Sequence, residues 1–492
     1  MYTLGVDIGT FESKGVLVDG QGHIVAQAAR GHEMIVPRPG WAEHRPEQDW
    51  WGDFVFLTRA LLKGVDASRV KAVACSAIGP CMLPLDGAGN PVMNGVLYGV
   101  DTRAVQEIDS LNKALGEDAV MARCGNALTS QSVGPKILWL KRHHPELWAR
   151  TEKVVTATTF LTLRLTGECV IDHYTAANFS PLYDIERQDW CPDFGDICGR
   201  EMLPRLMWSG EIAGQVTARA AAETGLVPGT PVTCGTIDAA AEAVSVGVTK
   251  PGDMMMMYGS TIFIIEVTDR RLTDPRLWHA PWLHPGSHAA MAGLATSGTL
   301  THWFRDQFAR DLARDTAFAK LTEEAMASPP GARGLICLPY FSGERTPIHD
   351  AQAKGAFFGL NLTHGRGEMY RAVLEGIAAA TRHITDTYAE AGAAPKRVLA
   401  VGGGTKNRPW LQATSDMTGL DQVVARVTTG ASFGNAWLAA RALGSAARIE
   451  DWNPAAEVVR AVAHPAYARQ YPLFRRLYAQ TRDIAAELTD AP

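Results

Sequence analysis

The sequence contains no closely spaced cysteine pair, although it has eight cysteines. They are scattered singly along the chain: Cys75, Cys81, Cys124, Cys169, Cys191, Cys198, Cys234 and Cys337. Scattered cysteines without a CxxC pair argue against a structural zinc site and against a disulfide framework. We therefore expect free thiols and a cytoplasmic location, where thiols stay reduced.

The chain also lacks a surplus of positive charge and a long hydrophobic run. It has 47 Lys and Arg residues against 52 Asp and Glu residues, a formal net charge of −5, so a nucleic acid partner is not expected. The most apolar-looking stretch, DMMMMYG at 253–259, is far shorter than the ~20 residues of a membrane span. The N-terminus shows no signal-peptide pattern, and we expect no membrane partner.

The length of 492 residues is too great for one ordinary core and predicts two domains. Helical and strand patterns alternate, which is typical of α/β folds. No low-complexity linker separates the halves, and the turn-forming stretch TKPGD at 249–253 is the expected boundary. We therefore divide the chain into residues 1–250 and 251–492, and expect the two domains to pack around a central cleft.

Two stretches share one strand pattern. Residues 2–28 predict three strands joined by tight turns, an antiparallel meander. At 253–268, two apolar runs again flank a small, hydroxyl-bearing turn, which indicates a weak internal duplication. Further patterns predict helices at 46–63, 104–115 and 135–142 and a strand at 70–75.

An aspartate stands in the middle of the first apolar run, YTLGVDIG. Leu4, Val6 and Ile8 alternate and predict a strand, in which an unpaired carboxylate is costly to bury. Asp7 therefore needs a partner. Because Mg²⁺ takes few protein carboxylates and keeps several waters, we expect Asp7 to hold Mg²⁺ through water beside phosphate groups.

Two turns, one in each half, could surround phosphate oxygens. Gly9-Thr10 and Gly259-Ser260-Thr261 combine small side chains, hydroxyl groups and exposed backbone N–H groups, whose dipoles attract anions. The alternative for each is an ordinary hairpin turn. Their occurrence as a pair favours the phosphate interpretation.

A run of three glycines lies in LAVGGGTKNRPW at 399–410, between a predicted strand and a helix beginning near Pro409. The absence of side chains lets a flat ligand or a phosphate approach the backbone closely. The alternative is a tight strand-to-helix turn. The pattern differs from the dinucleotide motif GxGxxG, so it does not favour a dehydrogenase.

Asp238 follows an apolar strand and opens an Ala-rich helix in PVTCGTIDAAAEAV. One interpretation is a helix N-cap or first-turn acid, worth about 1 kcal/mol. The other is a general base, because phosphoryl transfer to an alcohol needs a carboxylate that accepts the hydroxyl proton.

These residues belong to longer motifs, and with them the sequence resembles the FGGY family of carbohydrate kinases over essentially its whole length. The most specific stretch is GAFFGLNLTHGRGEMYRAVLEG at 355–376, which is similar to the C-terminal signature of the family. Supporting matches are DIGT at 7–10, GWAEHRPEQDWW at 40–51, LRLTGE at 163–168, GTIDAAA at 235–241, PYFSGERTP at 339–347 and VGGGTKNRPW at 401–410.

The resemblance implies two ribonuclease H-like domains of the actin and hexokinase type, with ATP and Mg²⁺ in the central cleft and a sugar on the N-terminal side. It implies Asp238 as the catalytic base and Asp7 near the metal. For the nucleotide it implies contacts from Gly9, Thr10, Lys14, Gly259, Ser260, Thr261, Gly402, Gly403, Gly404 and Asn407. YGVDTR at 98–103 resembles the sugar-side region, so Asp101 and Arg103 join Asp238 as candidate sugar contacts. Their alternative is an ion pair in a surface turn.

The sequence is nearest to the xylulokinase members of the family, through GERTP and GWAEHRPEQDWW, but it departs from them in places. AIGPC at 77–81 replaces their Gly-Gln-Met-His-Gly segment, which removes a polar Gln and His. Thr159 stands where an acid is expected, and Tyr174 where a Ser is expected. The first family signature, around Lys136 and Trp139, is only partly kept.

The resemblance implies ATP-dependent phosphorylation of a hydroxyl on a small carbohydrate: a pentulose such as xylulose, or a related ketose, sugar acid or polyol. The alternative is an actin-like conformational switch that hydrolyses ATP without a small acceptor. A glycosidase using Asp7 and Asp238 explains neither the glycine turns nor the duplication. Homodimers are common in the family, and nothing in the sequence locates an interface.

Overall fold

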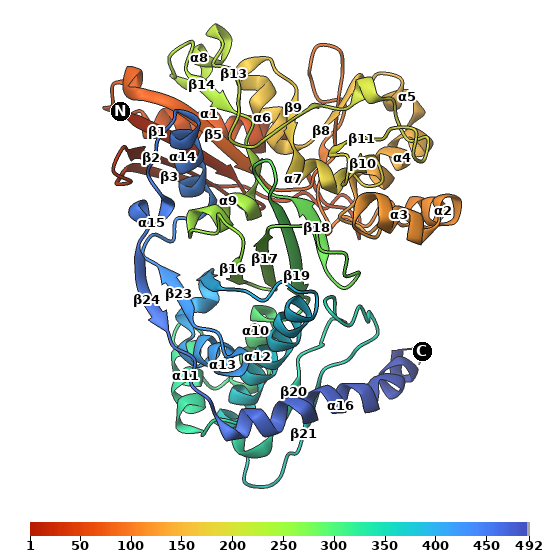
Figure 1. Ribbon diagram of the computed structural model, residues 1–492, viewed down its shortest axis with the longest axis vertical. Helices are drawn as coiled ribbons and strands as arrows, with labels where there is room; N and C mark the ends of the chain where they lie inside the picture. Colours follow the sequence, from red (N-terminus) through yellow and green to blue (C-terminus); the bar gives the residue numbers. More distant parts are fainter. Residues whose placement is uncertain (490–492) are drawn as a thin grey trace.

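The computed structural model describes residues 1–489 and contains two α/β domains, one above the other (Figure 1). Each domain is built on a seven-stranded sheet. In the first sheet the order is β13 (Ile212–Gln215), β14 (Pro231–Thr233), β5 (Val70–Ala77), β1 (Tyr2–Ile8), β2 (Glu12–Asp19) and β3 (Ile24–Gly31), with β15 (Thr236–Ile237) paired to β5. In the second it is β18 (Trp278–Pro281), β19 (His288–Leu294), β17 (Ile262–Thr268), β16 (Asp253–Tyr258), β22 (Arg397–Val401), β23 (Gln422–Ala425) and β24 (Ala455–Val459).

The two sheets repeat one arrangement of strands. In the first, β1 pairs antiparallel with β2 and parallel with β5. In the second, β16 pairs antiparallel with β17 and parallel with β22. The predicted meander at the N-terminus and the predicted duplication are both confirmed, because each repeat opens with a hairpin whose first strand then gains a parallel neighbour.

The predicted helices are present with small shifts at their ends. They are α1 (Gly52–Leu61), which follows a π-helical turn at Pro46–Trp51, α2 (Val105–Leu115) and α4 (Val133–His143). The family signature forms the long helix α12 (Arg366–Glu390), and α13 (Arg408–Thr418) follows the three glycines. Within residues 1–489, every helix is too short or too polar to span a lipid bilayer.

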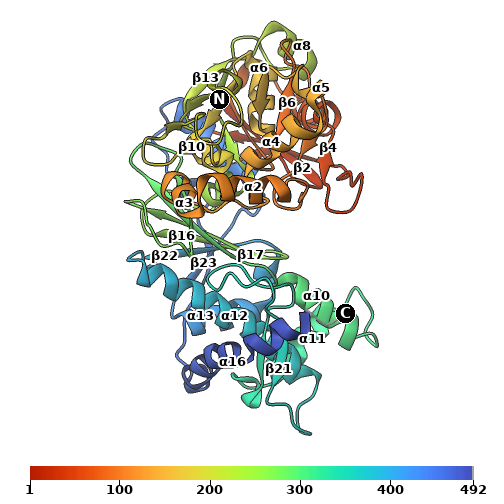
Figure 2. The same cartoon turned by 90° about the vertical axis from the view of Figure 1, so that its right-hand side faces the viewer.

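The methionine run of β16 packs into two separate cores, because alternate residues of a strand point to opposite faces. Met255 lies in the core that also contains Ile237 and Val244 of the first domain. Met254 and Met256 lie in the core under α12. Figure 2 shows this second sheet lying between the first domain and the layer of α12 and α13. The two domains therefore share a continuous core, which fixes how they meet.

Helix α14 (Ala431–Ala442) lies late in the chain but packs on the sheet of the first domain (Figure 1). A Cβ atom on Gly5 of β1 would stand 1.9 Å from the carbonyl oxygen of Ser432, so the two backbones touch. The side-chain amide of Asn435 donates to the carbonyl of Val6 at 2.8 Å and to Ser76 Oγ at 2.7 Å. Residues from the second half of the sequence thus form one layer of the first domain.

We predict that Gly5→Ala destabilises the protein by about 1–3 kcal/mol, because the added methyl group would push α14 off β1. Chemical denaturation monitored by tryptophan fluorescence measures the change. Gly20→Ala is the matched control, since a Cβ atom there meets no other atom within 4 Å. Equal midpoints for both variants would contradict the close packing of α14 on β1.

Candidate active site

Three neighbouring strands of the first sheet end at one edge and carry the polar residues of the site. Asp7 of β1 lies opposite Ser76 of β5, and Ser76 lies opposite Thr236 of β15. Asp238, which comes two residues after Thr236, is the first residue of α9 (Asp238–Ser245). The parallel pairing therefore brings Asp7 and Asp238 together, although 231 positions separate them in the sequence.

The Asp7 carboxylate is half-buried, and Ser76 Oγ donates to its Oδ1 at 2.6 Å. Burial raises the pKa of Asp7 to about 6, and the Ser76 hydrogen bond and the charge of Lys14 oppose the rise. Lys14 lies opposite Asp7 in the β1–β2 ladder, but its ammonium group pairs with Glu12 at 3.1 Å. Within residues 1–489, Asp7 therefore forms no ion pair with a Lys, Arg or His side chain.

Asp238 occupies the first turn of α9, where the Ala239 N–H donates to its Oδ1 at 2.7 Å. The first-turn acid predicted as one alternative is thus present. Burial raises the pKa of Asp238 well above its usual range, and the charges of Asp7 and Glu242 raise it further. A carboxyl group that binds a proton readily is suited to take one from a ligand.

Glu242 is a third carboxyl group of the site, and sequence reasoning missed it. It lies one helical turn after Asp238, on the same face of α9. A Cβ atom on Gly430, just before α14, would stand 2.4 Å from its Oε2. Burial and the charge of Asp7 raise the pKa of Glu242 to about 7, while Lys14 opposes the rise. The spacing of four residues from Asp238 was the signal that could have identified it.

In each of the two glycine turns, the N–H group of the first glycine donates a hydrogen bond inside the turn. The Gly9 N–H donates to Glu12 O at 3.2 Å, and the Gly259 N–H donates to Thr261 O at 3.1 Å. The expectation of exposed amides is therefore wrong for these two groups, because each closes its own turn. The second turn is fixed from outside by the Ser297 N–H, which donates to Ser260 O at 3.2 Å.

A cavity of about 640 Å³, here called the glycine cavity, joins the second turn to the three-glycine stretch. Its lining includes Gly259, Ser260, Gly403, Gly404, Lys406 and Asn407. Gly402 sits at φ +95°, and its absent side chain keeps the backbone close to Tyr258. Asn407 caps α13 through the Trp410 N–H at 3.3 Å. Predicted nucleotide residues from two distant segments thus line one cavity.

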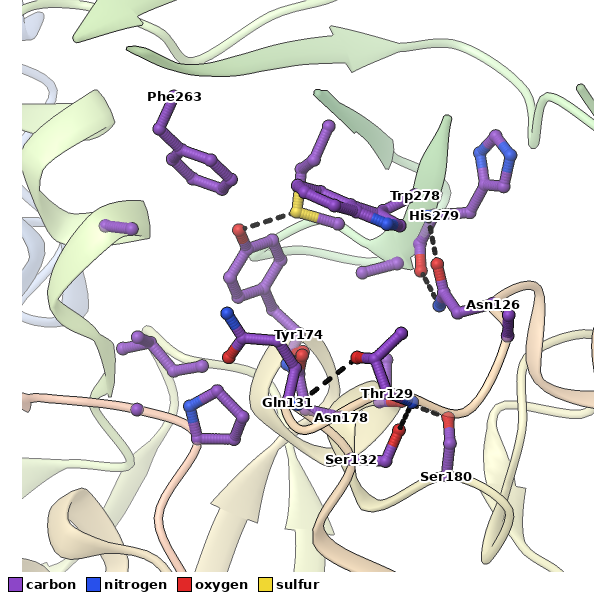
Figure 3. Close-up of a pocket in the computed structure, with 18 residues that line it drawn as sticks. Asn126, Thr129, Gln131, Ser132, Tyr174, Asn178, Ser180, Phe263, Trp278 and His279 are labelled. Atoms are coloured by element: carbon purple, nitrogen blue, oxygen red, sulfur yellow. Dashed lines mark hydrogen bonds between the residues drawn. The ribbon is translucent and has the colours of Figure 1, made fainter. Parts of the chain in front are cut away.

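A second cavity, of about 130 Å³ and here called the interdomain cavity, lies beside Asp238 (Figure 3). Ile237 and Ala239, which flank Asp238, line it together with Gly79 and Pro80 of the AIGPC segment. Polar side chains come from Asn126, Gln131, Tyr174 and Asn178, and the second domain adds Phe263, Trp278 and Met291. Figure 3 shows Phe263 and Trp278 on the side opposite Gln131 and Asn178, so both domains form its walls.

Asp101 and Arg103 form a buried ion pair, so the alternative of a pair in a surface turn is wrong. Asp101 is 0% exposed and accepts from Arg103 Nη2 at 2.8 Å and from the Ala42 N–H at 2.7 Å. The guanidinium group stacks 3.9 Å from the ring of Trp41. Neither residue lines the two cavities described above.

The buried ion pair holds the loop that carries Tyr98. The Asp101 N–H donates to Tyr98 O at 2.9 Å, and buried Lys136 donates to the same carbonyl at 3.0 Å. Burial raises the pKa of Tyr98, a hydrogen bond from Thr10 lowers it, and the charge of Asp238 raises it. Tyr98, which sequence reasoning did not single out, is therefore coupled to both the first turn and Asp238.

The two other departures from the xylulokinase pattern have different outcomes. Thr159 is buried and donates to Val170 O at 2.7 Å, so it serves the fold of the first domain. Tyr174 lines the interdomain cavity, and its hydroxyl group donates to Met291 Sδ at 3.0 Å. Of these two, only Tyr174 is placed to affect a ligand.

Comparison with known proteins relates both halves of the chain to one family. The profile of the FGGY family of carbohydrate kinases, N-terminal domain, matches residues 2–245, and that of the C-terminal domain matches residues 254–443. The xylulose kinase of Escherichia coli K12 is 31% identical over 99% of this chain and 100% of that protein. The xylulose kinase structure from Rhodospirillum rubrum is 32% identical with a TM-score of 0.92, over 99% of this chain and 100% of that chain. The gluconokinase of Bacillus subtilis 168 is 25% identical over 86% of this chain and 84% of that protein.

We predict that Glu242→Gln stabilises the metal-free protein by about 1–3 kcal/mol at pH 8 and by less at pH 5. The folded-state pKa of about 7 lies above the unfolded value, so the folded state loses stability as the pH rises from about 4.5 to 7. The substitution removes this loss. Urea titrations at both pH values, with EDTA, measure the difference.

Glu33→Gln, at an exposed position, is the control for this measurement. The same gain in the free energy of unfolding for both variants would contradict a raised pKa of Glu242. A gain for Glu242→Gln that does not grow with pH would contradict it as well.

Proposed function

The chain belongs to the FGGY family of carbohydrate kinases, and on this premise we propose that it transfers the γ-phosphoryl group of Mg-ATP to a hydroxyl group of a neutral pentulose such as xylulose. It is an ATP-dependent sugar kinase with two domains of the actin and hexokinase type. The observation that carries the proposal is the position of Asp238: its neighbours Ile237 and Ala239 line the interdomain cavity, and the charge of Asp7 raises its pKa.

The lining of the interdomain cavity supports a neutral acceptor. It contains amides, hydroxyl groups and aromatic rings, but no Lys, Arg, Asp or Glu among the described residues. Its single histidine, His279, bonds through Nε2 to Asp274 O at 3.0 Å, and burial lowers its pKa. A sugar acid would bury its carboxylate there without a cation, which is unfavourable. A ketose or polyol can use the amides for its hydroxyl groups.

Phosphoryl transfer in this geometry needs one proton acceptor. The Ala239 N–H donates a hydrogen bond to Asp238 Oδ1. The other carboxylate oxygen, Oδ2, can then accept the hydroxyl proton of the acceptor. As the oxygen of that hydroxyl bonds to the γ-phosphorus, the bond to the β,γ-bridging oxygen breaks and ADP leaves. The walls from both domains keep water away from the reacting oxygen.

The residues beside Asp238 fit Mg²⁺. Asp7, Asp238 and Glu242 place three carboxyl groups in one region. Burial raises the pKa of each, and the charge of Asp7 raises that of Asp238 and Glu242 further. No group of three such side chains within residues 1–489 is close enough to bind a metal alone. Asp7 would hold the ion together with water and phosphate oxygens, which Mg²⁺ prefers. The ion supplies positive charge that the phosphates require.

For the nucleotide, we assign the glycine cavity. Gly403 and Gly404 leave space for a flat base, and Lys406 adds a positive charge at its wall. The second turn, Gly259–Thr261, lies at the same cavity and is assigned to the phosphates. Gly9, Thr10 and Lys14 would approach the same phosphates from the first domain.

The proposal also covers the cellular location and the oligomeric state. All eight cysteines are free thiols, which supports the cytoplasm as the place of action. A homodimer is carried over from the family resemblance alone. An ATP-driven switch without an acceptor leaves the cavity beside Asp238 unexplained, so it is not favoured.

Coupled measurement of ADP release with Mg-ATP, across pentuloses, hexuloses, polyols and aldonic acids, tests the acceptor. We predict the highest kcat/KM for a pentulose such as xylulose, and a value at least about tenfold lower for every aldonic acid, because the cavity offers no cation. Preference for an aldonic acid would contradict the neutral acceptor. ATP hydrolysis that no compound stimulates would contradict a small acceptor altogether.

For Asp238→Asn we predict a loss of sugar-dependent ATP consumption of about 10²–10⁴-fold, because the variant cannot accept the hydroxyl proton. Binding of Mg-ATP, measured by calorimetry, should change little. Asp109→Asn, at an exposed position of α2, should behave as the wild type. Turnover near the wild-type rate in Asp238→Asn would rule out Asp238 as the base.

A further inference from the structure

A loop of the second domain is hydrogen-bonded to the end of β19 and to the residues just after it. It runs from β20 (Ile336–Leu338) to β21 (Ala356–Phe358) and contains the sequence GERTP at 343–347. Glu344 is 5% exposed, and its Oε1 accepts from the Ala295 N–H and from the Arg345 N–H, both at 2.7 Å. Thr346 is 0% exposed and accepts from the Gly293 N–H at 3.4 Å. Both neighbours of Arg345 are therefore fixed to the end of β19.

The end of β19 adjoins the cavity walls. Gly293 pairs with Phe263, which lines the interdomain cavity. Just beyond β19, the Ser297 N–H donates to Ser260 O in the turn assigned to the phosphates. The loop is thus attached to the element that joins the acceptor wall to the phosphate turn.

Arg345 differs from both of its neighbours. Glu344 and Thr346 are buried against β19, whereas Arg345 is exposed. Its side chain forms no ion pair or hydrogen bond within residues 1–489. Its backbone N–H donates to Glu344 Oε1, and its carbonyl accepts from the His349 N–H at 2.6 Å. A guanidinium group without a partner, on a backbone fixed at both sides, is available to a ligand.

The positive charge of Arg345 acts across the cleft. It lowers the pKa of Tyr98 in the first domain, whereas burial and the charge of Asp238 raise it. The charges of Asp238 and Arg345, one from each domain, therefore both act on Tyr98.

The proposed site contains more negative than positive side chains, and Arg345 can supply positive charge to it. The first domain brings Asp7, Asp238 and Glu242 to the site, and Lys14 there is already paired with Glu12. ATP adds further negative charge. Phosphoryl transfer is accelerated by cations placed on the oxygens of the transferring group, and a planar guanidinium group fits two such oxygens at once.

We propose that Arg345 is a catalytic residue of this kinase, which donates hydrogen bonds to the non-bridging oxygens of the phosphoryl group as it passes from ATP to the acceptor. The inference rests on the proposed function, since it assigns a role within that reaction. Arg345 keeps its proton throughout, while the acceptor proton goes to Asp238 and ADP is the leaving group. The second domain thus contributes directly to the chemistry.

The test compares Arg345→Ala and Arg345→Lys with the wild type in the coupled assay. We expect kcat to fall by about 10²–10³-fold in Arg345→Ala and by less in Arg345→Lys, which keeps the charge but not the planar group. KM for the acceptor and the Kd of Mg-ATP should change less than about threefold. Added guanidinium ion at low millimolar concentration should restore part of the activity of Arg345→Ala.

Arg469→Ala, at an exposed position of α16 (Pro465–Thr489), is the matched control and should leave kcat unchanged. Melting temperatures of all variants separate a folding defect from a catalytic one, and rescue by guanidinium ion could not follow from misfolding. An unchanged kcat for Arg345→Ala, or a rise in acceptor KM alone, overturns the proposal, because the residue would then not act in the transition state.

The wild-type protein distinguishes failure of the proposed function from failure of the role of Arg345. If the proposed function is wrong, the wild type phosphorylates no sugar of the panel. In that case Arg345 is tested by calorimetry with Mg-ADP and fluoroaluminate, which resembles the transferring group. At least tenfold weaker binding of the fluoroaluminate complex to Arg345→Ala, with unchanged binding of Mg-ADP, supports the role. Equal binding of the complex to both proteins overturns it.

Discussion

The site depends on one electrostatic constraint: carboxyl groups are gathered where parallel strands end, without enough positive charge to balance them. The register of β1, β5 and β15 places Asp7 beside the start of α9, and Asp238 and Glu242 follow on one face of that helix. Burial raises the pKa of each group because the charged form is poorly solvated. Such a site is complete only when cations reach it, and this requirement links the metal, the nucleotide and the second domain.

The architecture allows the two domains to share the work of the site. Met255 and its neighbours join the domains in one core, and α14 extends the second half of the chain over the first sheet. The cavity beside Asp238 has walls from both sides, and the glycine cavity belongs to the second domain. Because catalysis by positioning requires fixed relative placement, this continuous packing is itself part of the active site.

In the proposed site, the positions assigned to acceptor selection are separate from those assigned to phosphoryl transfer. Gly79, Pro80 and Tyr174 lie where the sequence departs from the xylulokinase pattern, and all three line the interdomain cavity. Apolar contacts there replace a polar Gln and His, while amides such as Gln131 and Asn178 remain. Function in such folds resides in the site rather than in the architecture, so these few positions can change the substrate while the chemistry stays the same.

The sequence by itself determined the elements and the family: the period-2 strands, the paired glycine turns and the long C-terminal signature are local patterns that survive folding. It also indicated Asp7 and Asp238 through their unusual local context. Tertiary structure alone decided that Asp101 and Arg103 form a buried pair, that Glu242 joins the carboxyl groups, and that the charge of Arg345 acts on Tyr98. The reason is physical: burial, charge coupling and contact between distant segments depend on strand register and domain packing, which no local stretch of sequence contains.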